Sequence, residues 1–269
     1  MVMKQAVVNV SIVTYRTDPK ELERCLSCLT SMCVRRVYVI DNGKDGVIAD
    51  ICARYGCLYV PNENVGYGAA HNIAMTKTVE GEACYHLVLN SDVFFDASVI
   101  DRIIEYMSAD PDIGMVQPRI LSSDGTLQYT VRRLPSPLDL FCRRFLPRIF
   151  FSIHDDRYLL KHLDHNVAFN VPYHQGSFMM ISRDALLEAG LFDERFFMYP
   201  EDIDLTRRIH RHRSTMYYPE VEVIHCHRAE SYRSMRMTWI HAVNMVRYFN
   251  KWGWWRDDER RRFNAMLDY

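Results

Sequence analysis

Apolar runs rich in β-branched residues alternate along the chain with segments of helical spacing. The run at 7–14 predicts a strand, and Asp18 followed by Pro19 predicts the start of a helix over 19–32. Continued along the chain, the pattern predicts strands at 36–40, 57–60, 84–89, 113–117, 176–182 and 216–224, and helices at 45–55, 66–79, 97–109, 183–189 and from 200. Strands alternating with helices predict an α/β fold, with a mostly parallel, Rossmann-like central sheet flanked by helices.

The alternation is interrupted between 119 and 172, where prolines and paired arginines accumulate. We expect loops and short helices in this stretch, which either cover the sheet or form a lid beside a second substrate. The tail from about 235 predicts one long helix, or two helices with a break near Gly253.

Composition argues against several classes of function. Hydrophobic residues make up 48% and charged residues 25% of the 269 residues, as in an ordinary globular protein with a full core. Lys and Arg number 33 against 34 Asp and Glu, so no overall field attracts nucleic acid. Neither a membrane span nor a signal peptide is indicated, and we expect a cytoplasmic protein. Cys25 and Cys28 have a zinc-ligand spacing without a matching second pair, so we interpret the eight cysteines as buried free thiols.

Polar residues follow the predicted strands at the ends where such sheets bind their ligands. They are Thr14 and Tyr15 after the first strand, Asp41 after the second, and Asn90, Ser91 and Asp92 after the strand at 84–89. The Asp41 carboxylate can accept hydrogen bonds from a nucleobase or ribose, and Asp92 can hold a divalent cation shared with phosphates. His225 ends the strand at 216–224 and can complete a metal site with Asp92, with His227 as second candidate. Taken alone, Asn90 to Asp92 are better explained as a turn that caps the next helix, and the histidine that is not a ligand is explained as an ordinary buried histidine.

Two further segments carry candidate chemistry. Asn64, Gly66 and Gly68 open the helix predicted over 66–79, where glycines allow close approach of a ligand and the helix N-terminus favours phosphate; Asn72 lies in its first turns. An ordinary tight turn is the alternative. Glu201 and Asp202 open the helix from 200 after an aromatic run, where a carboxylate in an apolar pocket can act as general base. Alternatively they only cap the helix and complement its dipole, and Asp204 is expected to have a structural role, pairing with Arg207 or Arg208.

Together these residues resemble family 2 glycosyltransferases, in particular the rhamnosyltransferase-like branch. The matching segments are VSIVTY at 10–15, VIDNG at 39–43, NENVGYGAAHN at 62–72, LVLNSDV at 87–93, GSFMMISRDAL at 176–186, GLFDERFFMYPEDIDL at 190–205 and VIHCHRAESYRS at 223–234. The resemblance implies a GT-A catalytic domain over 1–232, with a nucleotide-binding half at 1–118 and an acceptor-binding, catalytic half at 119–232, followed by a helical extension at 233–269.

The resemblance also implies roles and substrates. Donor binding falls to Thr14, Tyr15, Asp41, Asn64, Gly66, Gly68, Asn72, Asn90, Ser91 and Gly176, metal binding to Asp92 and His225, and catalysis to Asp202 as base with Glu201 beside it. Mg²⁺ or Mn²⁺ is the implied cofactor. Asn90 stands where many relatives have an aspartate, so we expect the cation to be held weakly before the donor arrives. The implied reaction is an inverting transfer from a dTDP- or UDP-linked sugar, rhamnose first, to a glycan or lipid-linked acceptor in surface polysaccharide synthesis.

Other functions are open from the residues alone. A sugar nucleotidyltransferase would need a glycine-rich basic loop after the first strand, where Tyr15 to Pro19 contains no glycine. A non-catalytic nucleotide-sugar-binding module would not need Glu201 and Asp202. The C-terminal helix mixes tryptophans with arginines, which suits either packing onto the domain or peripheral contact with the inner face of the cell membrane.

Overall fold

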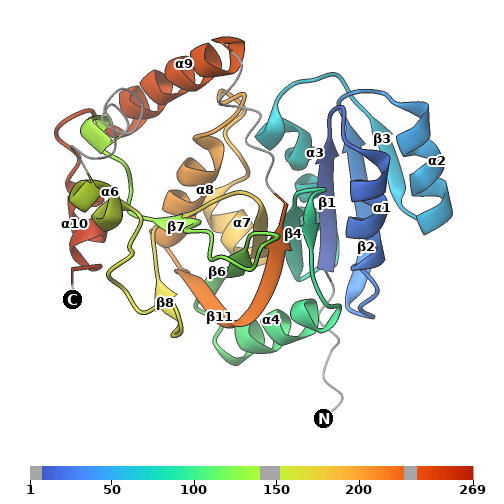
Figure 1. The fold of residues 1–269 in the computed structure, drawn as a ribbon, viewed down its shortest axis with the longest axis horizontal. Helices are drawn as coiled ribbons and strands as arrows, with labels where there is room; N and C mark the ends of the chain where they lie inside the picture. The colour runs from blue at the N-terminus through green and yellow to red at the C-terminus, as the bar shows by residue number, and fades with distance from the viewer. Residues whose placement is uncertain (1–7, 140–151, 227–234, 269) are drawn as a thin grey trace.

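The computed structural model describes residues 8–139, 152–226 and 235–268. A nine-stranded sheet in these residues is flanked by helices (Figure 1), in the order β3–β2–β1–β4–β10–β6–β11–β5, with β8 also paired to β11. The strands are β1 (Val8–Thr14), β2 (Val34–Asp41), β3 (Leu58–Pro61), β4 (Tyr85–Leu89), β5 (Val93–Phe94), β6 (Ile113–Leu121), β8 (Phe169–Asn170), β10 (Phe178–Ser182) and β11 (Ser214–His225). β5, β8 and β10 are antiparallel to their neighbours, and the other strands run in one direction. The predicted α/β fold is confirmed.

Helices cover both faces of the sheet. α1 (Pro19–Ser27), α2 (Gly46–Tyr55) and α4 (Ser98–Ala109) pack on one face, and α3 (Tyr67–Val79), α7 (Arg183–Ala189) and α8 (Glu201–His210) pack on the other. On β10, Phe178 and Met180 join the first apolar cluster, while Met179 and Ile181 join the second. This alternation is that of a strand buried on both faces. The sheet is therefore the rigid base from which polar residues project at its edge.

The first helix is shorter than predicted. Asp18 caps α1 by accepting a hydrogen bond from the Lys20 N–H at 3.0 Å, as its position before Pro19 predicts. The helix ends at Ser27, and Met32, which the prediction placed on its buried face, is 88% exposed. The chain turns over 29–33 so that β2 can begin at Val34 beside β1. Helical spacing alone could not reveal this early end.

Between β6 and β10 the chain forms short elements, as predicted for 119–172. β7 (Val131–Arg132) and β9 (Tyr173–His174) form a separate antiparallel pair, and α6 (Ser152–Tyr158) lies between them in sequence. The segment 140–151, which holds much of the predicted lid, lies outside the described residues, as does His227.

The C-terminal helices pack against α8. α9 (Met235–Trp252) and α10 (Asp258–Ala265) contribute Met245, Tyr248, Phe249 and Phe263 to an apolar cluster shared with Ile203 of α8 (Figure 1). The predicted break falls at Gly253, whose φ of +103° favours glycine. In the described part of the chain, no helix is both long and apolar enough to cross a bilayer.

The described cysteines are free thiols, but not all are buried as predicted. Cys25 and Cys52 are buried, whereas Cys84 is exposed. Cys142 lies outside the described residues. Burial raises the pKa of the Cys25 thiol, which keeps this sulfur protonated in the core.

Candidate active site

A cavity of about 980 Å³ lies where β4, β6 and β11 end and α8 begins. Its walls differ in chemistry. Asn90, Gln128, Ser177 and His225 give one part a polar lining, and Glu201 and Asp202 bring two carboxylates to it. The remaining wall is mainly aromatic side chains and methionines, among them Tyr129, Tyr158, Tyr173, Met198, Tyr199, Met237 and Met245. This combination suits a polar group undergoing reaction beside a larger, less polar partner.

The carboxylate of Asp202 is held by two backbone amides. Oδ2 accepts from the Gly176 N–H at 3.0 Å, and Oδ1 accepts from the Ile203 N–H at 2.7 Å. Burial raises the pKa of Asp202 to about 7, although both hydrogen bonds and the charge of Arg132 oppose the rise. A carboxylate with a pKa near neutrality can remove a proton at physiological pH.

Glu201 lies beside Asp202 in a different environment. Its Oε2 is buried and has no hydrogen-bond partner among the described residues, and burial followed by the charge of Asp202 raises its pKa. Two adjacent buried carboxylates cannot both be charged cheaply, so one is expected to keep a proton. Pro200 stands at the N-cap position and makes no side-chain cap hydrogen bond, and Asp202 accepts from one first-turn amide, that of Ile203. Capping by Asp202 therefore does not account for the burial of Glu201.

The structure brings Asp92 and His225 together, as predicted. Oδ1 of Asp92 lies 3.4 Å from Nε2 of His225, and the Cys226 N–H donates to the Asp92 carbonyl at 3.0 Å. Gln128 fixes the imidazole, because its Oε1 lies 3.0 Å from Nδ1 and its Nε2 donates to the His225 carbonyl at 2.8 Å. A proton on Nδ1 leaves the Nε2 lone pair facing a carboxylate, an arrangement that a cation between them would stabilise.

The donor set fits a divalent cation that also uses ligands from substrate. No cluster of three His, Cys, Asp or Glu side chains able to hold a metal occurs among the described residues. Asp92 and His225 would thus supply two ligands, with oxygens of a diphosphate completing the shell. Asn90 cannot add a charged ligand, because its side chain is a neutral amide, and its Oδ1 accepts from the Tyr67 hydroxyl at 2.8 Å.

Tyr67 is a site residue that the sequence did not single out. Its hydroxyl lies 2.8 Å from Asn90 Oδ1 and 2.6 Å from the Gly176 carbonyl. Burial and then the charges of Glu201, Asp202 and Asp92 raise its pKa, so it remains a hydrogen-bond donor. A Cβ on Gly176 would lie 3.4 Å from both Asp202 Cβ and Tyr67 Cε1, so this glycine fits between the base and the tyrosine.

Comparison with known proteins identifies the family. Residues 10–190 match the family described as Glycosyl transferase family 2. The chain belongs to this family. The match includes Asp92 and Gly176 but ends before Glu201, Asp202 and His225.

Several characterised relatives resemble this family 2 glycosyltransferase over most of its length. An N-acetylglucosaminyl-diphospho-decaprenol L-rhamnosyltransferase of Mycobacterium tuberculosis is 31% identical over 97% of this chain and 90% of its own. Rhamnosyltransferase WbbL of Escherichia coli is 25% identical over 79% of this chain and 81% of its own. The low-salt glycan biosynthesis hexosyltransferase Agl10 of Haloferax volcanii is 26% identical over 76% of this chain and 62% of its own. These likenesses agree with the predicted rhamnosyltransferase-like branch.

The fold is also shared with a solved glycosyltransferase. The crystal structure of GalNAc-T7 with UDP, GalNAc and Mn²⁺ matches with a TM-score of 0.58 at 15% identity. The alignment covers 84% of this chain and 45% of that one, so the family 2 chain spans less than half of that protein's length. At this identity the match supports the GT-A fold alone.

Gly66 and Gly68, in the predicted ligand loop, lie too close to neighbouring residues for a side chain to fit. The φ of Gly66 is +106°, and a Cβ at this position would lie 2.4 Å from the Phe197 carbonyl oxygen. A Cβ on Gly68 would lie 2.8 Å from Cβ of Phe192. Both glycines are therefore required by close packing against the segment before α8. Their contact with the donor stays a prediction.

Asn72 also has a structural role. Its Nδ2 donates to the Phe192 carbonyl at 2.9 Å and its Oδ1 accepts from the Phe192 N–H at 3.0 Å. The side chain is buried and both polar atoms are used within the protein. Asn72 therefore holds the segment before α8 and is not among the residues that line the cavity, and its role in donor binding stays a prediction.

The residues predicted to hold the nucleotide lie along the same sheet edge but outside the cavity wall. Asp41 is buried and accepts four hydrogen bonds, from Thr14 Oγ1, the N–H groups of Gly43 and Asp45, and Tyr59 Oη, at 2.6–3.1 Å. It therefore fixes the loop that follows β2. Tyr15 and Asn64 are exposed nearby, and Ser91 separates Asn90 from Asp92.

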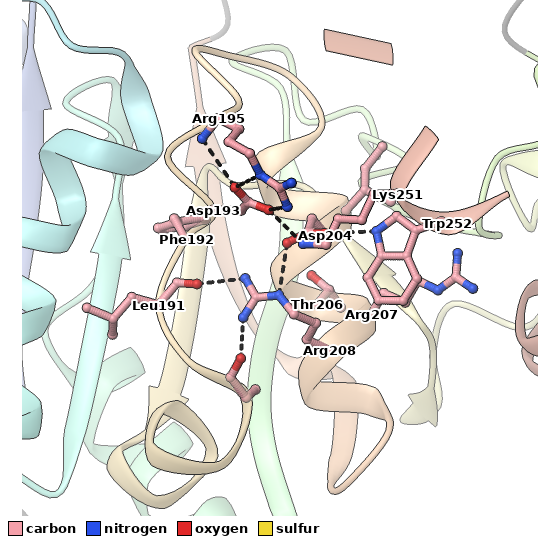
Figure 2. A network of polar contacts seen from close by, with 12 residues as sticks. Leu191, Phe192, Asp193, Arg195, Asp204, Thr206, Arg207, Arg208, Lys251 and Trp252 are labelled. Atoms are coloured by element: carbon pink, nitrogen blue, oxygen red, sulfur yellow. Dashed lines mark hydrogen bonds and ion pairs between the residues drawn. The ribbon is translucent and has the colours of Figure 1, made fainter. Parts of the chain in front are cut away.

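Asp204 anchors the C-terminal helices to α8 (Figure 2). Its Oδ2 accepts from Arg208 Nε at 2.9 Å, as one predicted pairing proposed, and its Oδ1 accepts from Trp252 Nε1 at 2.8 Å and lies 2.6 Å from Lys251 Nζ. Lys251 also contacts Asp193 Oδ2 at 2.7 Å. Arg207, the other predicted partner, instead pairs with Asp257 at 2.6 Å. These ion pairs connect α9 to the helix that carries Glu201 and Asp202.

Proposed function

We propose that this glycosyltransferase transfers rhamnose from dTDP-rhamnose to a lipid-linked sugar, with inversion at the anomeric carbon, in surface polysaccharide synthesis. A UDP-linked sugar is the alternative donor. The choice of rhamnose is supported by the names of the M. tuberculosis and E. coli relatives. The choice of a lipid diphosphate acceptor is supported by the name of the first, which matches 97% of the chain. The polar and apolar walls of the cavity suit a sugar joined to a lipid.

The observation that carries the inverting mechanism is the buried Asp202 carboxylate, with its pKa of about 7, in the wall of this cavity. Asp202 takes the proton of an acceptor hydroxyl while that oxygen forms a bond to the anomeric carbon. The bond from this carbon to the diphosphate breaks on the opposite face. Glu201 in its protonated form donates a hydrogen bond to a substrate oxygen, and Tyr67 keeps Asn90 and Gly176 in place around the sugar.

We assign the metal to Asp92 and His225, held in orientation by Gln128. When bound, Mg²⁺ or Mn²⁺ would offset the negative charge of the leaving diphosphate. We assign the nucleotide to the adjoining edge, with Thr14 and Asp41 shaping the loop and Tyr15, Asn64 and Ser91 at its surface.

We further propose that α9 lies on the membrane that contains the acceptor. Met235, Trp239, Ala242 and Val246 are exposed and recur with helical spacing, so they form an apolar stripe on the outer face of α9. Arg236 is exposed beside the stripe. The inner face of the same helix contributes Met237, His241 and Met245 to the cavity wall. Such a helix can bury its outer face in a bilayer interface while its inner face contacts the acceptor.

The test is transfer assayed with a panel of nucleotide sugars and a lipid-diphosphate-linked N-acetylglucosamine, with and without Mn²⁺. The expected result is one donor used in the presence of metal, giving a product whose anomeric configuration by NMR is opposite to that of the donor. A product with retained configuration would contradict the role of Asp202. Turnover of no donor by folded protein would contradict the proposed substrates.

A further inference from the structure

The cavity contains one conspicuous positive charge that none of the roles above uses. Among the described residues that line it, Arg132 is the only Lys or Arg, in a wall that also holds the carboxyl groups of Glu201 and Asp202. An anionic group entering this space would be repelled by the carboxylates unless a cation offsets them. Arg132 is placed to do so, since its charge acts on Asp202.

The guanidinium of Arg132 is oriented by its neighbours. Nε donates to the Tyr129 carbonyl at 3.1 Å, and the guanidinium carbon lies 5.6 Å from the ring centroid of Tyr173, the residue opposite Arg132 in the β7–β9 pair. The next residue, Arg133, instead pairs with Asp268 near the C-terminus. Alternation along β7 thus gives adjacent arginines different surroundings, with only the first in the cavity wall.

The position of Arg132 identifies which substrate it faces. Its strand partner Tyr173 packs in one apolar cluster with Tyr158 of α6 and Met245 of α9. This is the aromatic and methionine-rich part of the wall. Asp92 and His225, in contrast, lie at the ends of β5 and β11. A phosphate at Arg132 would therefore have apolar surface beside it, as a lipid diphosphate requires.

We propose that Arg132 binds a phosphate of the lipid-linked acceptor and thereby selects acceptors that carry a diphosphate over neutral glycosides. This inference rests on the proposed function. A guanidinium suits the task because its planar fork can donate two hydrogen bonds to one phosphate. The donor also carries a diphosphate, so the experiment must separate the two sources of this chemistry.

The experiment measures binding by calorimetry, independently of turnover, for three probes: farnesyl-diphospho-N-acetylglucosamine, octyl N-acetylglucosaminide and dTDP with Mn²⁺. The variants are Arg132→Gln, Arg132→Lys, and Arg157→Gln as a control that removes an exposed arginine outside the cavity wall. Loss of charge-assisted hydrogen bonds should weaken binding of the diphosphate probe by Arg132→Gln about 10- to 100-fold. Binding of the neutral glycoside and of dTDP should be unchanged, Arg132→Lys should be intermediate, and Arg157→Gln should match wild type.

Each other outcome overturns the proposal. Weaker binding of dTDP with an unchanged diphosphate probe would assign Arg132 to the donor. Equal loss for both acceptor probes would assign it to the shape of the cavity. Wild-type protein that binds the diphosphate probe no better than the neutral one would exclude a phosphate site at Arg132. Failure of the proposed function is distinct, because it would be seen as absence of transfer from every donor while these affinities are still measured.

Discussion

The Gly176 N–H donates to Asp202 Oδ2 at 3.0 Å, and this bond joins the segment before β10 to the first turn of α8. A second amide, that of Ile203, holds the other carboxylate oxygen at 2.7 Å. The two hydrogen bonds favour the charged carboxylate, while burial favours the neutral acid. Because burial has the larger effect, the pKa of Asp202 is raised to about 7. The protonation state of this group therefore changes within the range in which the enzyme would work.

The first prediction concerns activity and pH. Asp202→Asn is expected to lower kcat by about 100-fold or more, because it removes the proton acceptor, while donor affinity is kept. In the wild type, kcat/KM should fall as pH decreases below about 7, because the pKa of Asp202 is about 7 and only the charged form accepts a proton. A pH–rate profile and donor titrations measure both effects. An acid limb near pH 4, or a variant with near-normal kcat, would exclude Asp202 as the base.

The second prediction concerns stability in the same variant. A carboxyl whose pKa is raised on folding opposes folding once the pH exceeds its unfolded pKa, and the penalty is complete above its folded pKa. The rise of the Asp202 pKa from 3.8 to about 7 corresponds to a penalty of at most about 4 kcal/mol in the free energy of unfolding. Asparagine removes this penalty but also loses the hydrogen bonds to a charged acceptor, which costs about 1.5–3 kcal/mol. Asp202→Asn should thus be more stable than wild type by about 1–2 kcal/mol at pH 8.

Urea unfolding at two pH values measures this difference. The gain should disappear near pH 4, close to the unfolded pKa of 3.8, because little free energy is then needed to protonate wild-type Asp202 on folding. Met32→Ser, at an exposed position far from Asp202 in sequence, is the control, and its effect on stability should not depend on pH. A gain in stability that grows as the pH falls would contradict the raised pKa.

The sequence predicted best those site residues that follow strands. Asp41, Asp92 and His225 end buried apolar runs, so both the sheet and its polar edge could be inferred from periodicity. The proximity of Asp92 and His225 could be inferred from their positions at strand ends. The two residues are 133 positions apart in sequence, and the pairing of β5 with β11 brings them together. Asp202 was found because two adjacent carboxylates after an aromatic run are unusual.

The features that the sequence did not indicate depend on contacts between distant segments. Tyr67, Gln128 and Arg132 are residue types that are common in cores and loops, and only the fold places them in the cavity wall. Gly66 and Asn72 pack against Phe197 and Phe192, which lie more than a hundred residues away in sequence. The local sequence pattern carries no information about contacts between residues so far apart in sequence.

The third prediction concerns Gln128, a positioning residue for His225. Gln128→Leu removes the acceptor 3.0 Å from Nδ1, so the imidazole can adopt the other tautomer or rotate. Loss of such an outer contact is expected to weaken metal affinity about 10- to 100-fold. Mn²⁺ titration followed by EPR in the presence of dTDP measures this without turnover. Gln175→Leu, at another glutamine of the cavity wall, is the matched control. Unchanged Mn²⁺ affinity in Gln128→Leu would argue against His225 as a ligand.

The fourth prediction concerns the ion pairs that connect α9 to α8. Lys251 Nζ lies 2.6 Å from Asp204 and 2.7 Å from Asp193, and Asp204 is fully buried (Figure 2). Lys251→Met leaves these carboxylates without one of their cations, and the free energy of unfolding should fall by about 1.5–3 kcal/mol. Lys77→Met, which removes an exposed pair with Glu80, should change it by about 0.5 kcal/mol or less. Equal effects in the two variants would show that the connection contributes nothing beyond a surface ion pair.

The fifth prediction concerns the outer stripe of α9 and uses two methionines of equal exposure. Met235, at the start of the stripe, is 89% exposed, and Met32, on the turn after α1, is 88% exposed. Met235→Ser combined with Trp239→Ser should reduce flotation with vesicles of anionic lipid, because each buried apolar side chain contributes about 1.5–3 kcal/mol to interfacial binding. Met32→Ser should float as wild type does. Transfer to a short-chain soluble acceptor should be retained in all three proteins, since the stripe faces away from the cavity. If the double variant floats normally, or if wild type does not float with anionic vesicles at low salt, α9 is not a membrane contact and the lipid acceptor must reach the cavity by another route.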